Sequence, residues 1–458
     1  MLVGALVWEQ GVAIAAEPPA QPTVTLNPPS GYSNGWMNIT GTGFAPNDNV
    51  KLLFDDQQIG SGTISPWTGG VSFGAPIPKG TTFGAHRISI VGSATPADAA
   101  FATFTLRPTA WVQAGFSDSH AGFNPNESLL DGQSVGSLAR RCAAQASASV
   151  ATSSPAVVGG RMYVGTTFGD LLAFSTDACA RAWSVNVGPG AASSPAVVSG
   201  VAYVATSRGG IAAYKATTGA LLWRTNVSPG FSTPTVSHGR IIASGRDGNV
   251  YAFKSSDGTL LWSEAVGAGV ESPPSYTAVM GVLYVGSADG TVYALDPSTG
   301  KVNEARSMPV GGPVSAPPAI RSGRLFVATE NGIVTASDNY GVKKWSTQVG
   351  GVTTPLATDG TRVYVDVAGA GLRALSVKSG SVVWRSAVGA GESSPVVANG
   401  LVYLAESTHV GALDAATGES RWTASLSGSA LSGAVVAEGR VYAGSDDGAL
   451  TVFGLPNS

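Results

Sequence analysis

The most constraining feature of this sequence is a repeat of about 40 residues that fills roughly its C-terminal two thirds. Seven copies open with a Pro that usually follows Ser or Thr, and these Pro lie 38 to 44 residues apart. About eight residues after the Pro comes an aromatic strand such as Tyr203-Val204 or Tyr403-Leu404. Internal repeats of this length indicate an array of like supersecondary units, each stacked on the next.

Each repeat is predicted to contain four strands. A tight turn follows the aromatic strand, and its Asp-Gly and Asn-Gly forms supply the positive φ that a two-residue hairpin needs. A third strand such as 292–295 comes next, and then a second turn and a fourth strand that carries a Trp. Four antiparallel strands in about 40 residues make one propeller blade. An eighth copy, at Gly433, lacks the Pro but keeps the pattern. The sequence therefore predicts an all-β chain with an eight-bladed β-propeller.

The turn before the fourth strand has a fixed spacing of Ala, Gly six residues later and Trp four residues after that. Residues Ala213, Gly219 and Trp223 form one of four complete copies, and Glu304 stands where one partial copy would carry its Trp. An indole on an outer strand can pack against the neighbouring sheet where a small Ala leaves room. The predicted docking residues are Trp183, Trp223, Trp262, Trp345, Trp384 and Trp422.

Over residues 108–458 this spacing resembles the tryptophan-docking motif of the quinoprotein (PQQ-like) propeller family. The resemblance implies blades joined around a ring. Its non-catalytic branch includes outer-membrane assembly lipoproteins that bind other proteins, and its catalytic branch holds pyrroloquinoline quinone with calcium. Trp111, Phe116, the run 123–125 and Glu127 resemble the segment that precedes such propellers in secreted bacterial proteins.

The eighth repeat ends at Phe453 without a fourth strand. Closure of the ring predicts that this strand comes from the N-terminal side, around 137–145. Cys142 then takes the position of a docking Trp, and Cys179 takes the turn-Gly position of the first blade. Because both altered positions belong to adjacent blades, we predict a disulfide between Cys142 and Cys179. Two small buried thiols are the alternative.

The N-terminal part of the chain has a different pattern. Segments 23–26 and 37–40 alternate polar and apolar residues, as half-buried strands do. The turn 41–47 resembles that of bacterial Ig-like surface domains. The predicted domains are a signal-peptide remnant or disordered segment (1–19), an Ig-like β-sandwich (20–107), a lead-in segment (108–137) and the propeller (138–458).

Composition excludes several classes of partner. Charged residues make up 12% of the chain and the net charge is −3, without any Lys/Arg cluster. A phosphate backbone needs such a cluster, so nucleic acid is excluded as a partner. No run approaches the roughly 20 apolar residues of a membrane span. We expect a monomer that is secreted to the outside of the cell or to its surface.

The sequence contains few residue patterns that are typical of catalytic sites. The four His (His86, His120, His238 and His409) lie in four different structural units and are expected on the surface or in strands. Two Gly-x-Ser-x-Gly strings, around Ser72 and Ser134, lack the following helix that a nucleophile elbow requires. The eight repeats are near-minimal and offer no carboxylate cluster for calcium. We therefore predict no catalytic, cofactor-binding or metal-binding residues.

Propeller topology places a candidate recognition face where second-to-third strand turns and blade-to-blade connections meet. The leading hypothesis is a non-enzymatic protein-interaction scaffold that binds a protein or peptide there. A PQQ- and calcium-dependent dehydrogenase and a carbohydrate-binding surface protein are the alternatives, and ordinary solvated loop tips are the simpler interpretation of the charges. The candidate residues are Arg208, Arg246, Glu271, Glu330, Glu392, Glu406, His409 and Asp446.

Overall fold

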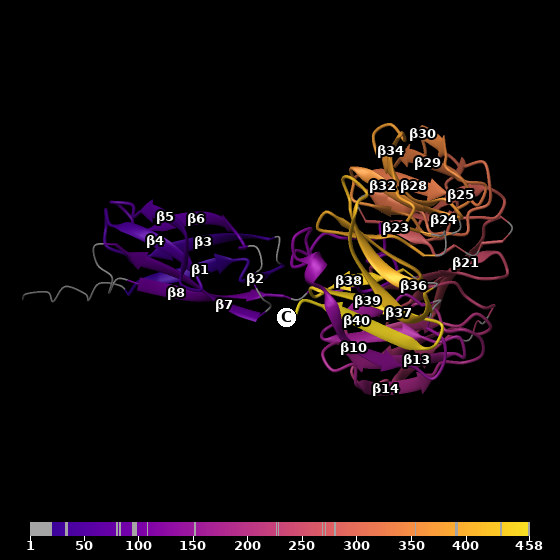
Figure 1. Cartoon of the computed structure of the whole chain (residues 1–458), viewed down its shortest axis with the longest axis horizontal. Helices are drawn as coiled ribbons and strands as arrows, with labels where there is room; N and C mark the ends of the chain where they lie inside the picture. The colour runs from indigo at the N-terminus through magenta and orange to yellow at the C-terminus, as the bar shows by residue number, and fades with distance from the viewer. Residues whose placement is uncertain are drawn as a thin grey trace, which may run out of the picture. The chain divides into compact units, whose positions relative to one another are not determined.

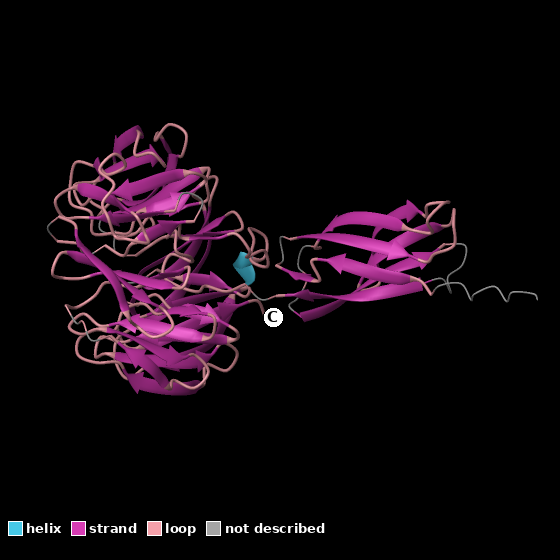
Figure 2. Ribbon diagram, turned by 180° about the vertical axis from the view of Figure 1, so that it is seen from behind, coloured by secondary structure: helices cyan, strands magenta, loops and turns pink. Residues whose placement is uncertain are grey.

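The computed structural model divides the chain into two compact units, Met1–Arg107 and Pro108–Ser458 (Figure 1). Nearly all regular structure in the described residues is β-strand, and the exception is a three-residue 3-10 helix, Val135–Ser137 (Figure 2). No helix of the described part is long and apolar enough to span a bilayer. The structure describes residues 21–456 except 33–34, 79–80, 82–83, 94–98, 108, 151–152, 226, 228, 268, 271, 279–280, 353, 390–392 and 431–432.

The N-terminal unit consists of two sheets around one core. Met37 and Ile39 from one sheet and Leu52 and Ile88 from the other are fully buried in a single apolar cluster. The sheet orders are β1-β3-β6 and β2-β8-β7-β4-β5. The strands are β1 (Thr23–Asn27), β2 (Ser30–Gly31), β3 (Trp36–Thr42), β4 (Asn49–Phe54), β5 (Gln57–Thr63), β6 (Val71–Pro76), β7 (Gly84–Gly92) and β8 (Ala99–Leu106).

The second unit is the predicted all-β propeller, with eight sheets of four strands each. Blades 1 to 4 consist of β11 (Ala156–Val158), β12 (Arg161–Gly165), β13 (Asp170–Ser175), β14 (Arg181–Asn186); β15 (Ala196–Val198), β16 (Val201–Ala205), β17 (Ile211–Lys215), β18 (Leu221–Arg224); β19 (Thr235–Ser237), β20 (Arg240–Ser244), β21 (Asn249–Lys254), β22 (Leu260–Ala265); and β23 (Ser275–Thr277), β24 (Val282–Gly286), β25 (Thr291–Leu295), β26 (Met308–Pro309).

Blades 5 to 8 complete the ring. Their strands are β27 (Ala319–Arg321), β28 (Arg324–Ala328), β29 (Ile333–Asp338), β30 (Lys343–Gln348); β31 (Ala357–Thr358), β32 (Arg362–Val367), β33 (Gly371–Ser376), β34 (Val382–Arg385); β35 (Val396–Ala398), β36 (Leu401–Asp414), β37 (Ser420–Ala430) with β9 (Phe123–Asn124); and β38 (Val435–Ala437), β39 (Arg440–Gly444), β40 (Ala449–Gly454) with β10 (Ala139–Gln145).

Turn chemistry and burial explain why each repeat becomes a blade. Gly248, Gly290, Gly332 and Gly448 have φ between 83° and 85°, a conformation that suits Gly in tight hairpin turns. The second and third strands are buried almost throughout because neighbouring blades cover both of their faces, whereas the fourth strands alternate exposed residues with buried or half-buried ones. In blade 7, β36 pairs at its start with β35 and at its end with β37, so one element fills two strand positions.

Six Trp side chains on outer strands contact the next blade. For five of them, all except Trp422, the Gly of that blade's turn leaves the space: a Cβ at Gly418 would lie 2.6 Å from the Trp384 ring, and Gly418 has φ of 78°. Each indole N–H donates to a carbonyl oxygen over 2.8 to 3.2 Å. The donor and acceptor pairs are Trp183 with Ala216, Trp223 with Ser255, Trp262 with Pro297, Trp345 with Val377, Trp384 with Ala415 and Trp422 with Leu138.

The seam between the ends of the propeller is closed twice. Strand β10 pairs antiparallel with β40, so the fourth strand of blade 8 comes from within the predicted segment 137–145. The predicted disulfide between Cys142 and Cys179 is confirmed, with the two Cα atoms 5.9 Å apart. Cys142 lies opposite Val452, as docking Trp residues lie opposite Ala in other blades. The covalent bond thus replaces the Trp–Gly contact at this one interface.

The two irregular repeats differ from the simple motif. Glu304 is exposed in a turn, and the outer strand of blade 4 is only the two-residue β26. The backbone of Arg306 fills the space over Gly341 instead, and its guanidinium lies 5.5 Å from the Tyr340 ring centroid. In blade 5, Trp345 pairs with Ala336, one residue later than the spacing predicts, because this hairpin is one residue shorter.

Candidate functional site

The lead-in segment contacts the inner strand of every blade in turn. Trp111 exchanges two backbone hydrogen bonds with Val157 of blade 1, each of 2.8 Å. The later residues of the segment bond to the equivalent position of the following blades. These bonds run from Val197 N to Val112 O, Val236 N to Gln113 Oε1, Tyr276 N to Asp118 O, Ile320 N to Ser119 O, Thr358 N to Ala121 O, Val397 N to Gly122 O, and Asn124 Nδ2 to Val436 O.

A buried carboxylate fixes the end of this segment. Glu127 is 3% exposed and accepts hydrogen bonds from the backbone N–H of Leu129, Leu130 and Gly439 at 2.8, 3.3 and 3.0 Å. Thr109 donates its hydroxyl to the same carboxylate. Gly439 belongs to the first turn of blade 8, so the segment lies at the end of the ring that carries the first-to-second strand turns.

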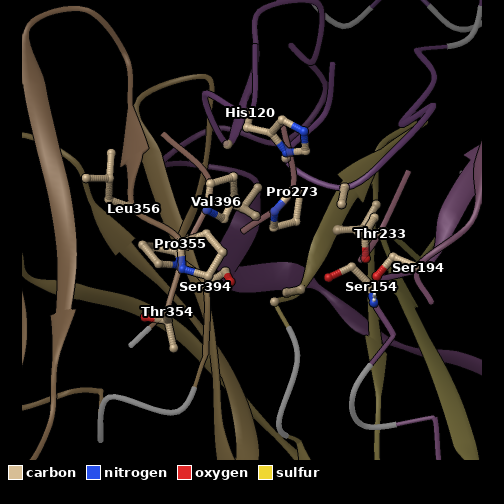
Figure 3. A pocket seen from close by; sticks show the side chains of 18 of the residues that line it. His120, Ser154, Ser194, Thr233, Pro273, Thr354, Pro355, Leu356, Ser394 and Val396 are labelled. Atoms are coloured by element: carbon tan, nitrogen blue, oxygen red, sulfur yellow. Dashed lines mark hydrogen bonds between the residues drawn. The ribbon is translucent and has the colours of Figure 1, made fainter. Parts of the chain in front are cut away.

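A cavity of about 280 Å³ occupies the ring centre and is bounded on one side by the lead-in segment (Figure 3). His120 lies at one end of the cavity, and the residues just before the inner strands of the blades line its walls. The lining is hydroxyl-bearing and apolar, and none of the described lining residues is Asp, Glu, Lys or Arg. Five of the six Ser and Thr that precede the repeat Pro thus come together here. They are Ser154, Ser194, Thr233, Thr354 and Ser394.

His120 is the functional residue that sequence reasoning missed. The expectation of a surface or strand position is wrong, since His120 is 2% exposed and lies in the lead-in segment with φ of 48°. Its Nε2 is 2.9 Å from Thr235 Oγ1, and that hydroxyl donates to Pro274 O. Thr235 therefore accepts from Nε2–H, which leaves Nδ1 as an acceptor without a partner among the described residues. Burial lowers the pKa of His120 to about 4.

This pKa predicts a pH-dependent stability. An unfolded His titrates near 6.5, so the stabilisation from neutral His120 is complete above that pH and is lost as the pH falls to about 4. The loss amounts to roughly 3 kcal/mol. His120→Asn, which tolerates positive φ, is expected to flatten the dependence of the unfolding free energy between these pH values, measured by urea denaturation. Equal slopes for both proteins would contradict the assignment.

The cavity does not fit pyrroloquinoline quinone with calcium. The quinone is an anion, and the described lining offers no Lys or Arg to its carboxylates. Calcium takes six to eight oxygens, several of them from carboxylates. In the part of the chain that the structure describes, no three His, Cys, Asp or Glu are grouped to hold a metal.

Of the eight residues predicted for the recognition face, six lie in the part of the chain that the structure describes. Arg208, Arg246 and Glu330 are exposed in turns between second and third strands. Glu271 and Glu392 lie outside the described residues. By strand order, the face is on the opposite end of the ring from the lead-in segment.

Two of the face carboxylates also hold neighbouring loops. Glu406 accepts from Gly389 N at 2.8 Å, and Asp446 accepts from Ser429 N at 2.8 Å, so each joins a turn to the preceding connection. Glu406 and exposed His409 line a cleft of about 270 Å³ at blade 7. Sequence reasoning could not assign these bonds, because they depend on loop geometry.

Three known proteins are similar to this chain, one in sequence and two in fold. Outer membrane protein assembly factor BamB of Moranella endobia is 27% identical over 168 residues, which is 32% of this chain and 42% of that protein. BamB from Moraxella catarrhalis superposes with a TM-score of 0.59 at 20% identity, covering 69% of this chain and 99% of that one. The quinohemoprotein alcohol dehydrogenase of Comamonas testosteroni gives 0.61 at 15% identity, over 75% and 80%. Both structural likenesses concern the fold.

The family model described as outer membrane protein assembly factor BamB matches residues 169–386 and 368–455. Together these ranges span more than half of the 458 residues and include the repeats with the docking Trp. The chain therefore belongs to this family of PQQ-like β-propellers.

Proposed function

We propose that this chain is a non-enzymatic propeller that acts as a protein-interaction scaffold at the cell surface or outside the cell. The proposal rests on a difference between the two ends of the propeller ring. One end is crossed by the chain's own lead-in segment, bonded to all eight inner strands. The other end presents exposed charges around a neutral cavity, where a partner's polypeptide segment can lie.

Two further observations support this function. The relatives in the same family include proteins named for outer-membrane protein assembly, an activity that involves protein partners in the cell envelope. The disulfide between Cys142 and Cys179 is typical of an oxidising compartment outside the cytoplasm.

The test is a pair of charge-reversal variants on opposite ends of the ring. Arg208→Glu with Arg246→Glu changes the recognition face. Lys215→Glu with Lys378→Glu makes the same change at exposed residues near third-to-fourth strand turns, on the lead-in side. Partners captured from envelope and culture-medium fractions are identified, purified and titrated against each variant. We expect about tenfold weaker binding for the first pair, stronger at low salt, and unchanged binding for the second.

A partner that both pairs weaken equally, or neither, would contradict the proposed face. The dehydrogenase alternative has its own readout: tryptophan fluorescence titrated with pyrroloquinoline quinone, with and without calcium. Saturable, calcium-dependent quenching would overturn the non-enzymatic proposal. We expect no saturable response, because the described cavity lining carries no charged residue to hold the anion.

A further inference from the structure

We propose that the outer face of the sheet β1-β3-β6 binds an extended, uncharged, β-1,4-linked glycan. This site lies in the N-terminal unit and is independent of the propeller and its proposed function. The inference starts from the alternation along the three strands, which turns every second side chain away from the core. The outward residues are Thr23, Thr25 and Asn27 on β1, Trp36, Asn38, Thr40 and Thr42 on β3, and Ser72, Gly74 and Pro76 on β6.

The chemistry of this face is uniform. Among these outward residues, all of which the structure describes, none carries a charge, and most offer a hydroxyl or an amide. Hydroxyls and amides donate and accept hydrogen bonds, as the hydroxyls of a neutral sugar do. A charged ligand would find no counter-ion among these outward side chains. The face therefore favours an uncharged, polar ligand over nucleic acid or an acidic glycan.

Trp36 provides a fixed aromatic platform. It is 57% exposed, yet its ring lies against the backbone of β6 at Gly74. A Cβ at Gly74 would lie 2.8 Å from the indole Nε1 and 3.0 Å from Cζ2, so only Gly allows this ring position. One side of the indole is thus packed on the sheet while much of its surface stays exposed. The apolar face of a sugar ring can stack on such a surface.

A cleft with several hydroxyl groups lies at the other end of the same face. It has a volume of about 300 Å³ and is lined by the hydroxyl-bearing residues Thr40, Thr42, Thr68 and Ser72, by Val71 and by glycine residues. Thr40 pairs directly with Ser72 across the two strands. The distance along β3 from Trp36 to Thr40 is about 13 Å at 3.3 Å per residue. A ligand that reaches both features is therefore a chain of sugars, and the extended course of β3 between them suits the ribbon shape of a β-1,4-linked chain.

The opposite sheet provides an internal contrast. Phe101 on β8 is 61% exposed, close to the value for Trp36, but the Arg87 guanidinium lies 4.5 Å from its ring centroid. Lys51 is also exposed on this sheet. The guanidinium over the Phe101 ring and the charge of Lys51 make this face a poor platform for a neutral sugar. Phe101→Ala is therefore a matched control for Trp36→Ala.

The experiment is calorimetric titration of the full chain with cellohexaose and chitohexaose. We expect saturable binding that changes little with salt, because no charges are involved. Trp36→Ala should weaken it at least tenfold, and Phe101→Ala should leave it unchanged. Gly74→Ala keeps the indole but displaces its ring, so it should weaken binding severalfold and shift tryptophan fluorescence. Thermal unfolding of each variant verifies that the N-terminal unit remains folded.

Absence of saturable binding to either hexasaccharide would overturn the proposal. Equal losses in Trp36→Ala and Phe101→Ala would also overturn it, since the contact would then not involve this face. Because the variants lie outside the propeller, the binding of a protein partner to Arg208 and Arg246 is tested separately and can fail or succeed independently.

Discussion

Cys142→Ser is expected to lower the free energy of unfolding of the propeller by about 4 kcal/mol. The disulfide joins positions 37 residues apart and so restricts the unfolded chain, and the loop-entropy relation gives this magnitude. The substitution also removes the covalent link between blades 8 and 1, an interface at which no docking Trp is present. Urea denaturation followed by fluorescence measures the change. Cys179 stays in place because its φ of 54° already disfavours most residues.

Reduction of the native protein serves as the control for this prediction. Reduced wild-type protein and Cys142→Ser should unfold at the same urea concentration, because both lack the bond and keep the rest of the seam. A variant as stable as the oxidised protein would show that the pairing of β10 with β40 closes the ring without covalent help.

Trp384→Ala is expected to lower the free energy of unfolding by about 3–5 kcal/mol. The side chain is 8% exposed, packs on Gly418 and donates its indole N–H to Ala415 O at 3.0 Å. Removal leaves a cavity between blades 6 and 7 and takes away one of the two donors to the Ala415 carbonyl, which keeps the Tyr364 hydroxyl at 3.2 Å. The measurement is urea denaturation with circular dichroism detection, since loss of a Trp changes the fluorescence itself.

Trp67→Ala is the matched control, because Trp67 is 92% exposed in the N-terminal unit. Its substitution should change the free energy of unfolding by less than about 0.5 kcal/mol. If both variants lower the free energy of unfolding by a similar amount, the docking role of Trp384 is refuted. If Trp384→Ala lowers it by less than about 1 kcal/mol, strand pairing alone holds the blades.

The propeller could be predicted from the sequence because each repeat contains the residues that determine its own turns and strands. The Asp-Gly and Asn-Gly turns, the buried strands and the Ala-Gly-Trp spacing act within or between adjacent repeats. The seam was predictable for the same reason, since Cys142 and Cys179 occupy positions that the other repeats define. Such agreement between local pattern and global fold is expected of a sequence that specifies one structure.

The lead-in segment was predicted from its resemblance, but its contacts could not be predicted because the segment has no period. Its residues bond through backbone groups to blades far along the chain, and neither hydropathy nor spacing encodes such partners. His120 is the clearest case: it looked like an isolated His, and only the ring brings Thr235 to its Nε2. For the recognition face, topology indicated where the charges gather, but the bonds of Glu406 and Asp446 to neighbouring loops depend on tertiary geometry.

The pairing of β10 with β40 has a consequence for the order of assembly. Ala139 lies opposite Gly454, so the outer strand of the last blade is synthesised roughly 300 residues before its partner. Until β40 emerges, β10 has no strand to pair with, and the lead-in segment has no complete ring to cross. Contacts of such long sequence separation form slowly. We therefore expect the pairing of β10 with β40 to form late in folding, and a chain that loses β40 should leave β10 as an open, aggregation-prone edge.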